Sequence, residues 1–154
     1  MANLSLQDLS KKMRDIDFTM LFTRADNGAA AGRPMSNNGQ VEYQGDSFFF
    51  TYESADMVRQ IERDPRVSMS LQGNKGLLGQ PPLFIAIEAE AQIIRDKPSF
   101  EEHWQKDLDR WFPHGPGTAG LAMLKVVAQR IHWWSGEDNG EIVLDRANHK
   151  QLSG

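Results

Sequence analysis

The chain contains no cysteine, which excludes disulfide staples, thiol nucleophiles and thiolate metal sites. No stretch approaches the roughly 20 consecutive apolar residues that a membrane helix needs. The N-terminal segment Met1–Leu6 also lacks the charged region and long apolar run of a secretory signal. We therefore expect a cytoplasmic protein, located in a reducing compartment, that has no membrane span.

Clusters of positive charge are also missing. The 17 Lys and Arg residues are outnumbered by 21 Asp and Glu, and no segment concentrates the basic ones as a nucleic-acid footprint would. The four histidines include no close pair at metal-ligand spacing, so we expect no metal site. A length of 154 residues predicts a single domain across the whole chain.

Runs of β-forming residues separated by turn signals are abundant. Three helices are also expected: residues 5–14 capped by Ser5, residues 55–63 ending before Pro65, and a late amphipathic helix from Pro98 to Phe112. The predicted strands are 18–23, 30–36, 45–52, 66–71, 84–91, 121–127 and 129–134, with 141–144 a short addition. Short connections favour an α+β fold built on a closed or partly open antiparallel barrel over a parallel βαβ sheet.

Several motifs that resemble functional sites have simpler explanations. A literal GxGxxG spans Gly115–Gly120, but it follows the end of a helix and not a strand, so we interpret it as a loop. The pair Asp107 and Asp109 diverges on a helix, and Glu88 and Glu90 share a strand face that should look to water. We expect none of these carboxylates to act in catalysis.

The segment Arg33-Pro34-Met35-Ser36 is the strongest candidate for ligand binding. Pro34 fixes its own φ and keeps Arg33 extended, so the guanidinium can present two parallel donors to a phosphate. Backbone groups at such an edge can bond a planar heterocycle. An ordinary edge strand whose arginine pairs with a carboxylate explains the same residues, and from these residues alone both readings stay open.

Taken together, a series of motifs resembles a known family. In order they are Arg33-Pro34-Met35, Phe48-Phe49-Phe50-Thr51, Asp64–Val67, Trp104, Trp111-Phe112-Pro113 with Gly115, and Trp133-Trp134. Their order and spacing are similar to those of the FMN-binding split barrels, most closely the bacterial general stress proteins related to pyridoxamine 5′-phosphate oxidase. The resemblance covers about residues 5–145.

This resemblance implies a six-stranded antiparallel split β-barrel with flanking helices, which dimerises and holds FMN in clefts between the subunits. It implies that Arg33 contacts the phosphate region, that Met35 and Ser36 border the isoalloxazine ring, and that Thr51 reaches toward the ribityl phosphate. The cofactor-binding residues implied in this way are Arg33, Pro34, Met35, Ser36, Phe50, Thr51, Ser54, Met57, Trp104, Trp111, Gly115 and Trp134. The three tryptophans are candidates for packing near the ring across the dimer, and a core or interface role explains each of them equally well.

The chain departs from the family pattern in two places. Met57 stands where the family often has a phosphate-binding lysine, and the serine that precedes that lysine is displaced to Ser54. Weaker FMN binding, or acceptance of FAD, follows unless Arg59 or Lys75 compensates. The C-terminus Asn148–Gly154 lacks the basic segment that holds the substrate phosphate in true pyridoxamine-phosphate oxidases, so vitamin B6 oxidation is not expected.

Two functional hypotheses remain at this level. The chain is either a flavin-dependent oxidoreductase that takes electrons from NAD(P)H or another donor, or a non-catalytic flavin-binding module for stress response or redox sensing. Both predict the same residues around the ring.

Overall fold

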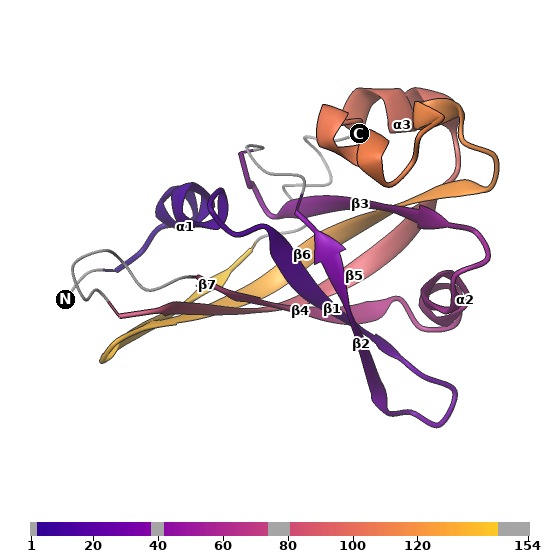
Figure 1. The fold of residues 1–154 in the computed structure, drawn as a ribbon. Coiled ribbons are helices and arrows are strands. Elements are labelled where there is room, and N and C mark those ends of the chain that lie inside the picture. Colours follow the sequence, from indigo (N-terminus) through magenta and orange to yellow (C-terminus); the bar gives the residue numbers. More distant parts are fainter. Residues whose placement is uncertain (1–2, 38–41, 74–80, 145–154) are drawn as a thin grey trace.

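A computed structural model describes residues 3–37, 42–73 and 81–144, and these residues form one twisted antiparallel sheet with helices at its margins (Figure 1). The strands are β1 (Phe18–Arg24), β2 (Ala30–Ser36), β3 (Asp46–Tyr52), β4 (Arg66–Gln72), β5 (Leu83–Ile94), β6 (Leu121–Ser135) and β7 (Asp138–Val143). Their order is β2-β1-β4-β5-β6-β3, with β7 paired to β6. The predicted α+β class is confirmed. The described residues contain seven strands instead of six, because the short addition near residue 141 pairs with β6 as a strand of its own.

The first two helices form close to where the sequence predicts them. Helix α1 (Leu6–Met13) begins at Ser5, whose hydroxyl accepts the Asp8 N–H while the Asp8 carboxylate accepts the Ser5 N–H, which is a capping box. Helix α2 (Asp56–Arg63) ends before Pro65. Its N-cap is Ala55, which has no side chain that can bond the first N–H groups of the helix.

The late helix differs from the prediction of one continuous helix. Helix α3 (Lys97–His103) stops at Trp104, whose backbone is extended with φ −71° and ψ 131°. A 3-10 helix, η1 (Lys106–Arg110), follows, and a 3-10 turn, η2 (Gly115–Gly117), comes after it. The interruption stops the apolar residues from sharing one helical face, so they approach the sheet from two separate segments.

The last long strand also differs from the prediction. Residues 121–127 and 129–134 belong to one continuous strand, β6, and not to two. Glu88 of β5 lies opposite Arg130 while Ala89 lies opposite Ala128, so Gln129 is the extra residue of a β-bulge. The bulge breaks the alternation of apolar side chains, and that break imitates a strand boundary in the sequence.

The hydrophobic core has two parts that meet at β3. Adjacent side chains of a strand point to opposite faces, and here both faces are covered: Phe49 is 2% exposed in the large cluster beneath the sheet, and Phe50 is 6% exposed in a smaller cluster under α3 and η1. Phe50 packs there with Phe100, Leu108 and Phe112. At Phe49 and Phe50, strand β3 is therefore covered on both faces although it is an edge of the sheet.

The remaining motifs lie where the sequence suggests. Glu88 and Glu90 are exposed on the outer face of β5, and the glycines of Gly115–Gly120 lead into strand β6 instead of following a strand and opening a helix. Trp133 is 2% exposed in the core, whereas its neighbour Trp134 is 39% exposed on the outer face. Within the described ranges, every helix is too short or too polar to cross a lipid bilayer.

Candidate functional site

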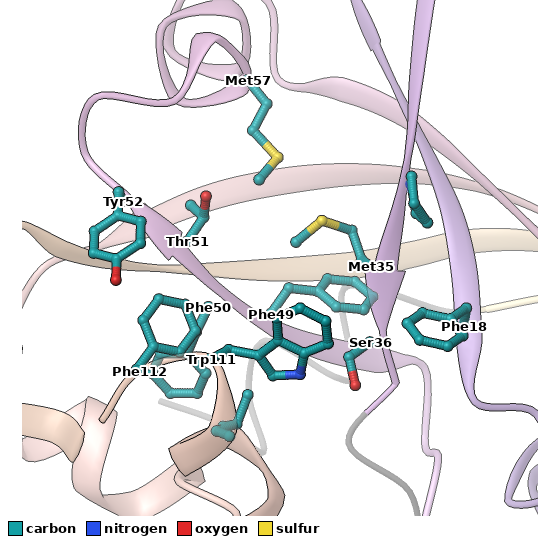
Figure 2. Close-up of a pocket in the computed structure, with 12 residues that line it drawn as sticks. Phe18, Met35, Ser36, Phe49, Phe50, Thr51, Tyr52, Met57, Trp111 and Phe112 are labelled. Carbon is teal, nitrogen blue, oxygen red and sulfur yellow. The ribbon is translucent and has the colours of Figure 1, made fainter. Parts of the chain in front are cut away.

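A pocket of about 320 Å³ lies between β2 and β3, two edge strands of the sheet that do not pair with each other (Figure 2). It is lined by Phe18, Pro34, Met35, Ser36, Phe49, Phe50, Thr51, Tyr52, Met57, Leu108, Trp111 and Phe112. The lining comes from both sheet edges, from α2 and from the segment around η1. Unpaired strand edges carry backbone groups that no neighbouring strand uses, so the pocket offers backbone donors and acceptors beside its apolar side chains.

The β2 wall brings together three of the predicted residues. Pro34, Met35 and Ser36 all line the pocket, next to Phe18 of β1, which lies opposite Ser36 in the sheet. Figure 2 shows the Met35 side chain extending from β2 toward β3. Side chains from both faces of β2 contribute because the pocket wraps around the end of this edge strand.

The β3 wall contains aromatic rings and a hydroxyl. The predicted residues Phe50 and Thr51 line the pocket together with Phe49 and Tyr52. Trp111 closes this side from the segment after η1, and it is 54% exposed, so its indole forms part of the rim. In Figure 2 the Trp111 indole lies in front of the β3 aromatics.

The lining carries no charged side chain. Nine of the twelve side chains are apolar, and the polar groups are the hydroxyls of Ser36, Thr51 and Tyr52. An apolar pocket with a few polar groups at its edges is the usual form of a small-molecule site. Its walls suit a flat, uncharged ring with hydrogen-bonding groups on its rim.

Arg33 lies outside the lining, beside Gln60 on the buried side of α2. Its Nη1 donates to Thr23 Oγ1 at 2.8 Å and to the Leu21 carbonyl at 3.4 Å, and its Nη2 donates to Gln60 Oε1 at 3.3 Å. No carboxylate in the described part of the chain bonds to it. Partial burial lowers the pKa of the guanidinium, and the distant charge of Asp56 opposes that shift. The alternative reading, in which Arg33 pairs with a carboxylate, is therefore not borne out among the described residues.

The position of the missing lysine forms part of the pocket wall. Met57 is 6% exposed and reaches from the first turn of α2 toward the pocket, as Figure 2 shows. Ser54 is exposed and does not line the pocket. Arg59 points away into ion pairs with Asp26 at 2.9 Å and Asp56 at 3.6 Å. Lys75 lies outside the described residues.

Three further predicted residues do not line the pocket. Trp104 lies behind Phe50, with its ring centroid 4.9 Å away in an edge-on contact, and its Nε1 donates to Asp109. Gly115 occupies the turn after Phe112 with φ +65°, a conformation that glycine adopts without strain. Trp134 lies on the outer face of β6, stacked on His132.

Five pocket residues were not among the predicted site residues. They are Phe18, Phe49, Tyr52, Leu108 and Phe112. Phe49 and Tyr52 flank the predicted residues Phe50 and Thr51 on the same strand, but no feature of the sequence extended the predicted site to them. Leu108 and Phe112 reach the pocket because the helix is interrupted at Trp104, and no feature of the sequence predicted that interruption.

A family model described as "Pyridoxamine 5'-phosphate oxidase like" matches residues 5–150. No curated protein matches the sequence. Among solved structures, a Clostridium acetobutylicum protein related to general stress protein 26 superimposes with a TM-score of 0.76 at 15% identity, over 92% of this chain and 95% of that chain.

Two other solved structures are of proteins named for the ligand that they bind. The general stress FMN/FAD binding protein of Xanthomonas citri has a TM-score of 0.67 at 20% identity, over 91% of this chain and 92% of that chain. A heme binding protein of Mycobacterium smegmatis has a TM-score of 0.70 at 12% identity, over 93% of this chain and 60% of that chain. At these identities the three structures are alike in fold.

Proposed function

Because the chain belongs to the pyridoxamine 5′-phosphate oxidase-like family, we propose that it is a general stress protein that binds a flavin in the pocket between β2 and β3. FMN is the proposed cofactor and FAD the alternative, in a single split-barrel domain spanning residues 1–154. Flavin-dependent oxidoreduction in the cytoplasm is the proposed activity. The observation that carries the proposal is the uncharged, aromatic pocket beside Pro34, Met35 and Ser36.

The ring of a flavin fits the chemistry of this pocket. Phe49, Phe50 and Trp111 provide apolar surface for a planar ring system. The hydroxyls of Ser36 and Thr51, with the backbone of the strand edges, provide bonding groups for the polar rim of the ring. A bound flavin supplies hydride or electron transfer, and the protein's residues orient it and exclude water.

The phosphate of FMN fits the unpaired charge of Arg33. A partly buried guanidinium that bonds only neutral oxygens remains uncompensated, and an anion that reaches it gains a charge-assisted hydrogen bond. Arg33 lies two residues before Met35 on the same face of β2, so its guanidinium approaches the pocket from behind that side chain. This supports the assignment of Arg33 to the phosphate.

A homodimer is part of the proposal, and the outer face of the sheet supports it. Met20 lies opposite Ser70, Ser70 opposite Ala86, and Ala86 opposite His132, which makes an uncharged row across four strands. The next row pairs Phe84 with Trp134, which are 42% and 39% exposed. Large exposed apolar side chains beside an uncharged row of this kind are typical of an interface.

We assign this face to a second copy of the chain because it continues into the pocket. Phe18, which is 54% exposed, belongs to the outer face of β1 and also lines the pocket. A volume of about 320 Å³ is at the lower end of the roughly 300–1,000 Å³ typical of ligand sites, so one chain encloses only part of a flavin. A partner on this face completes the enclosure, and Trp134 is the proposed contribution of the outer face to the partner's site.

The test of cofactor binding is the visible absorbance spectrum of the purified protein, before and after addition of FMN. We expect the flavin bands of a bound chromophore, and quenching of FMN fluorescence on titration. Absence of bound flavin together with absence of measurable affinity contradicts the proposal. A heme Soret band in a protein that has no affinity for flavin means that the pocket binds heme, the ligand in the name of the Mycobacterium smegmatis protein.

Activity is separated from simple binding by anaerobic titration of the flavin-loaded protein with NADH or NADPH. Rapid bleaching of the flavin bands is expected for an oxidoreductase. A flavin that stays oxidised with both donors favours a flavin-binding module for stress or redox sensing. Oxidation of pyridoxamine 5′-phosphate is not proposed.

A further inference from the structure

A buried cluster of polar side chains lies directly behind the pocket. Thr23 is 2% exposed and Gln60 is 7% exposed, and the Thr23 hydroxyl donates to Gln60 Oε1 at 2.6 Å. Arg33 donates to both side chains, at 2.8 and 3.3 Å. Polar groups this deeply buried are costly unless they are bonded, so the cluster holds its three members in one fixed arrangement.

Two pocket residues separate this cluster from the pocket. Gln60 follows Met57 by three residues on α2, and residues at that spacing share a helix face. Arg33 precedes Met35 by two residues on β2, and residues at that spacing share a strand face. The polar cluster therefore lies next to the Met35 and Met57 side chains, further along β2 and α2 from the pocket.

The orientation of the Gln60 amide is fixed by Arg33. A guanidinium can only donate, so the amide must turn its oxygen toward Nη2. The amide nitrogen of Gln60 then faces elsewhere, and no acceptor for it occurs among the described residues. Among the described residues, Gln60 Nε2 does not count as a fully enclosed and unbonded side-chain atom. Part of its surface is therefore open, and water or a ligand can reach it.

The cluster carries one positive charge and spare donors but no carboxylate bonded to it. Gln60 Nε2 and the remaining N–H groups of Arg33 are donors at the same place, and the uncapped first turn of α2 adds N–H groups one helical turn away. Asp56 lies in that turn and opposes an anion, but its carboxylate is ion-paired with Arg59. Donors around an unpaired charge are the chemistry that binds a phosphate monoester.

We propose that Gln60 is a specificity-determining residue for the phosphate group, and that with Arg33 it takes the place of the lysine that Met57 replaces. The proposal rests on the proposed flavin site. It assigns to the ligand a phosphate monoester, such as that of FMN, which displaces water behind Met35 and Met57 and accepts hydrogen bonds from Arg33 and the Gln60 amide nitrogen. Riboflavin has no phosphate and leaves both donors unused.

The test compares the dissociation constants of FMN and riboflavin in the wild-type protein and in Gln60→Glu. The variant is nearly isosteric, places a carboxylate against Arg33 and repels phosphate. We expect FMN affinity to fall at least about tenfold while riboflavin affinity changes less than about twofold. Gln7→Glu, the same substitution at an exposed position of α1, is the matched control and is expected to change neither constant.

A second measurement uses the wild-type protein and therefore does not require any variant to fold. The side-chain amide resonances of Gln60 in the wild-type protein are expected to shift on addition of FMN and to stay in place on addition of riboflavin. Equal effects of Gln60→Glu on both flavins, or Gln60 amide shifts of equal size with both, overturn the role of Gln60 while flavin binding stands. If the wild-type protein binds neither flavin, the proposed function itself fails, and the role of Gln60 fails with it.

Discussion

The indole of Trp104 packs edge-on against the ring of Phe50, with 4.9 Å between the ring centroids and 69° between the ring planes. Phe50 is a wall of the pocket, whereas Trp104 is not. The tryptophan therefore supports the pocket from behind, at the point where the chain leaves α3 and turns into η1.

Replacement of Trp104 by alanine tests this support. Truncation of fully buried aromatic side chains typically costs about 3–5 kcal/mol, and we expect about 2 kcal/mol here because Trp104 is only partly buried. Urea unfolding measures the loss, with Trp134→Ala on the outer face as the control at low protein concentration. An equal effect of the two substitutions contradicts a supporting role that is particular to Trp104.

Met57→Lys restores a positive charge at the position where the family often has a lysine. We expect the ligand-free protein to lose at least about 2 kcal/mol of stability, because an ammonium group replaces a thioether that is 6% exposed. FMN affinity should rise about tenfold relative to riboflavin, since one charge-assisted hydrogen bond is gained. Isothermal titration with both flavins measures the ratio, and Met57→Leu controls for the loss of the thioether. An unchanged ratio means that the phosphate does not come near α2.

Ala86→Glu tests the proposed dimer face. Ala86 lies between Ser70 and His132 in the uncharged row, so two carboxylates would be buried on association of two copies. We expect the dimer dissociation constant to rise at least about tenfold while the monomer stays folded. Sedimentation velocity measures the change. Gln92→Glu, which adds a charge near the other end of β5, should leave the assembly intact.

Asp64 contributes to the pH dependence of stability at acidic pH. Hydrogen bonds from the Arg66 side chain and backbone lower the pKa of Asp64 from 3.8 to about 2. The ionised form is favoured in the folded state, so this contribution to stability is complete above pH 3.8 and is lost as the pH falls through about 2. Carboxyl NMR titration should give a midpoint near the lower value. Asp64→Asn should remove this component of the acid-induced loss, and an ordinary midpoint for Asp64 contradicts the assignment.

The sequence predicted the elements that depend on local physics. Ser5 and Asp8 close the capping box because they lie three residues apart, and Pro65 ends α2 because its ring cannot continue a helix. The alternation of β4 and β5 sets which side chains are buried, whichever strands lie beside them. The family resemblance rested on the order of motifs along the chain, and the family match over residues 5–150 confirmed it.

Tertiary structure decided the rest. The break at Trp104 has no local signal, and the bulge at Gln129 is visible in the sequence only as a break in alternation that resembles a strand boundary, because each is set by what packs against the segment. The pocket arises because β2 and β3, neighbours in the sequence, become opposite edges of one sheet. The sequence singled out Arg33, but only the folded chain brings Gln60 and Thr23 against it, since their contact joins three elements whose separation is fixed by packing.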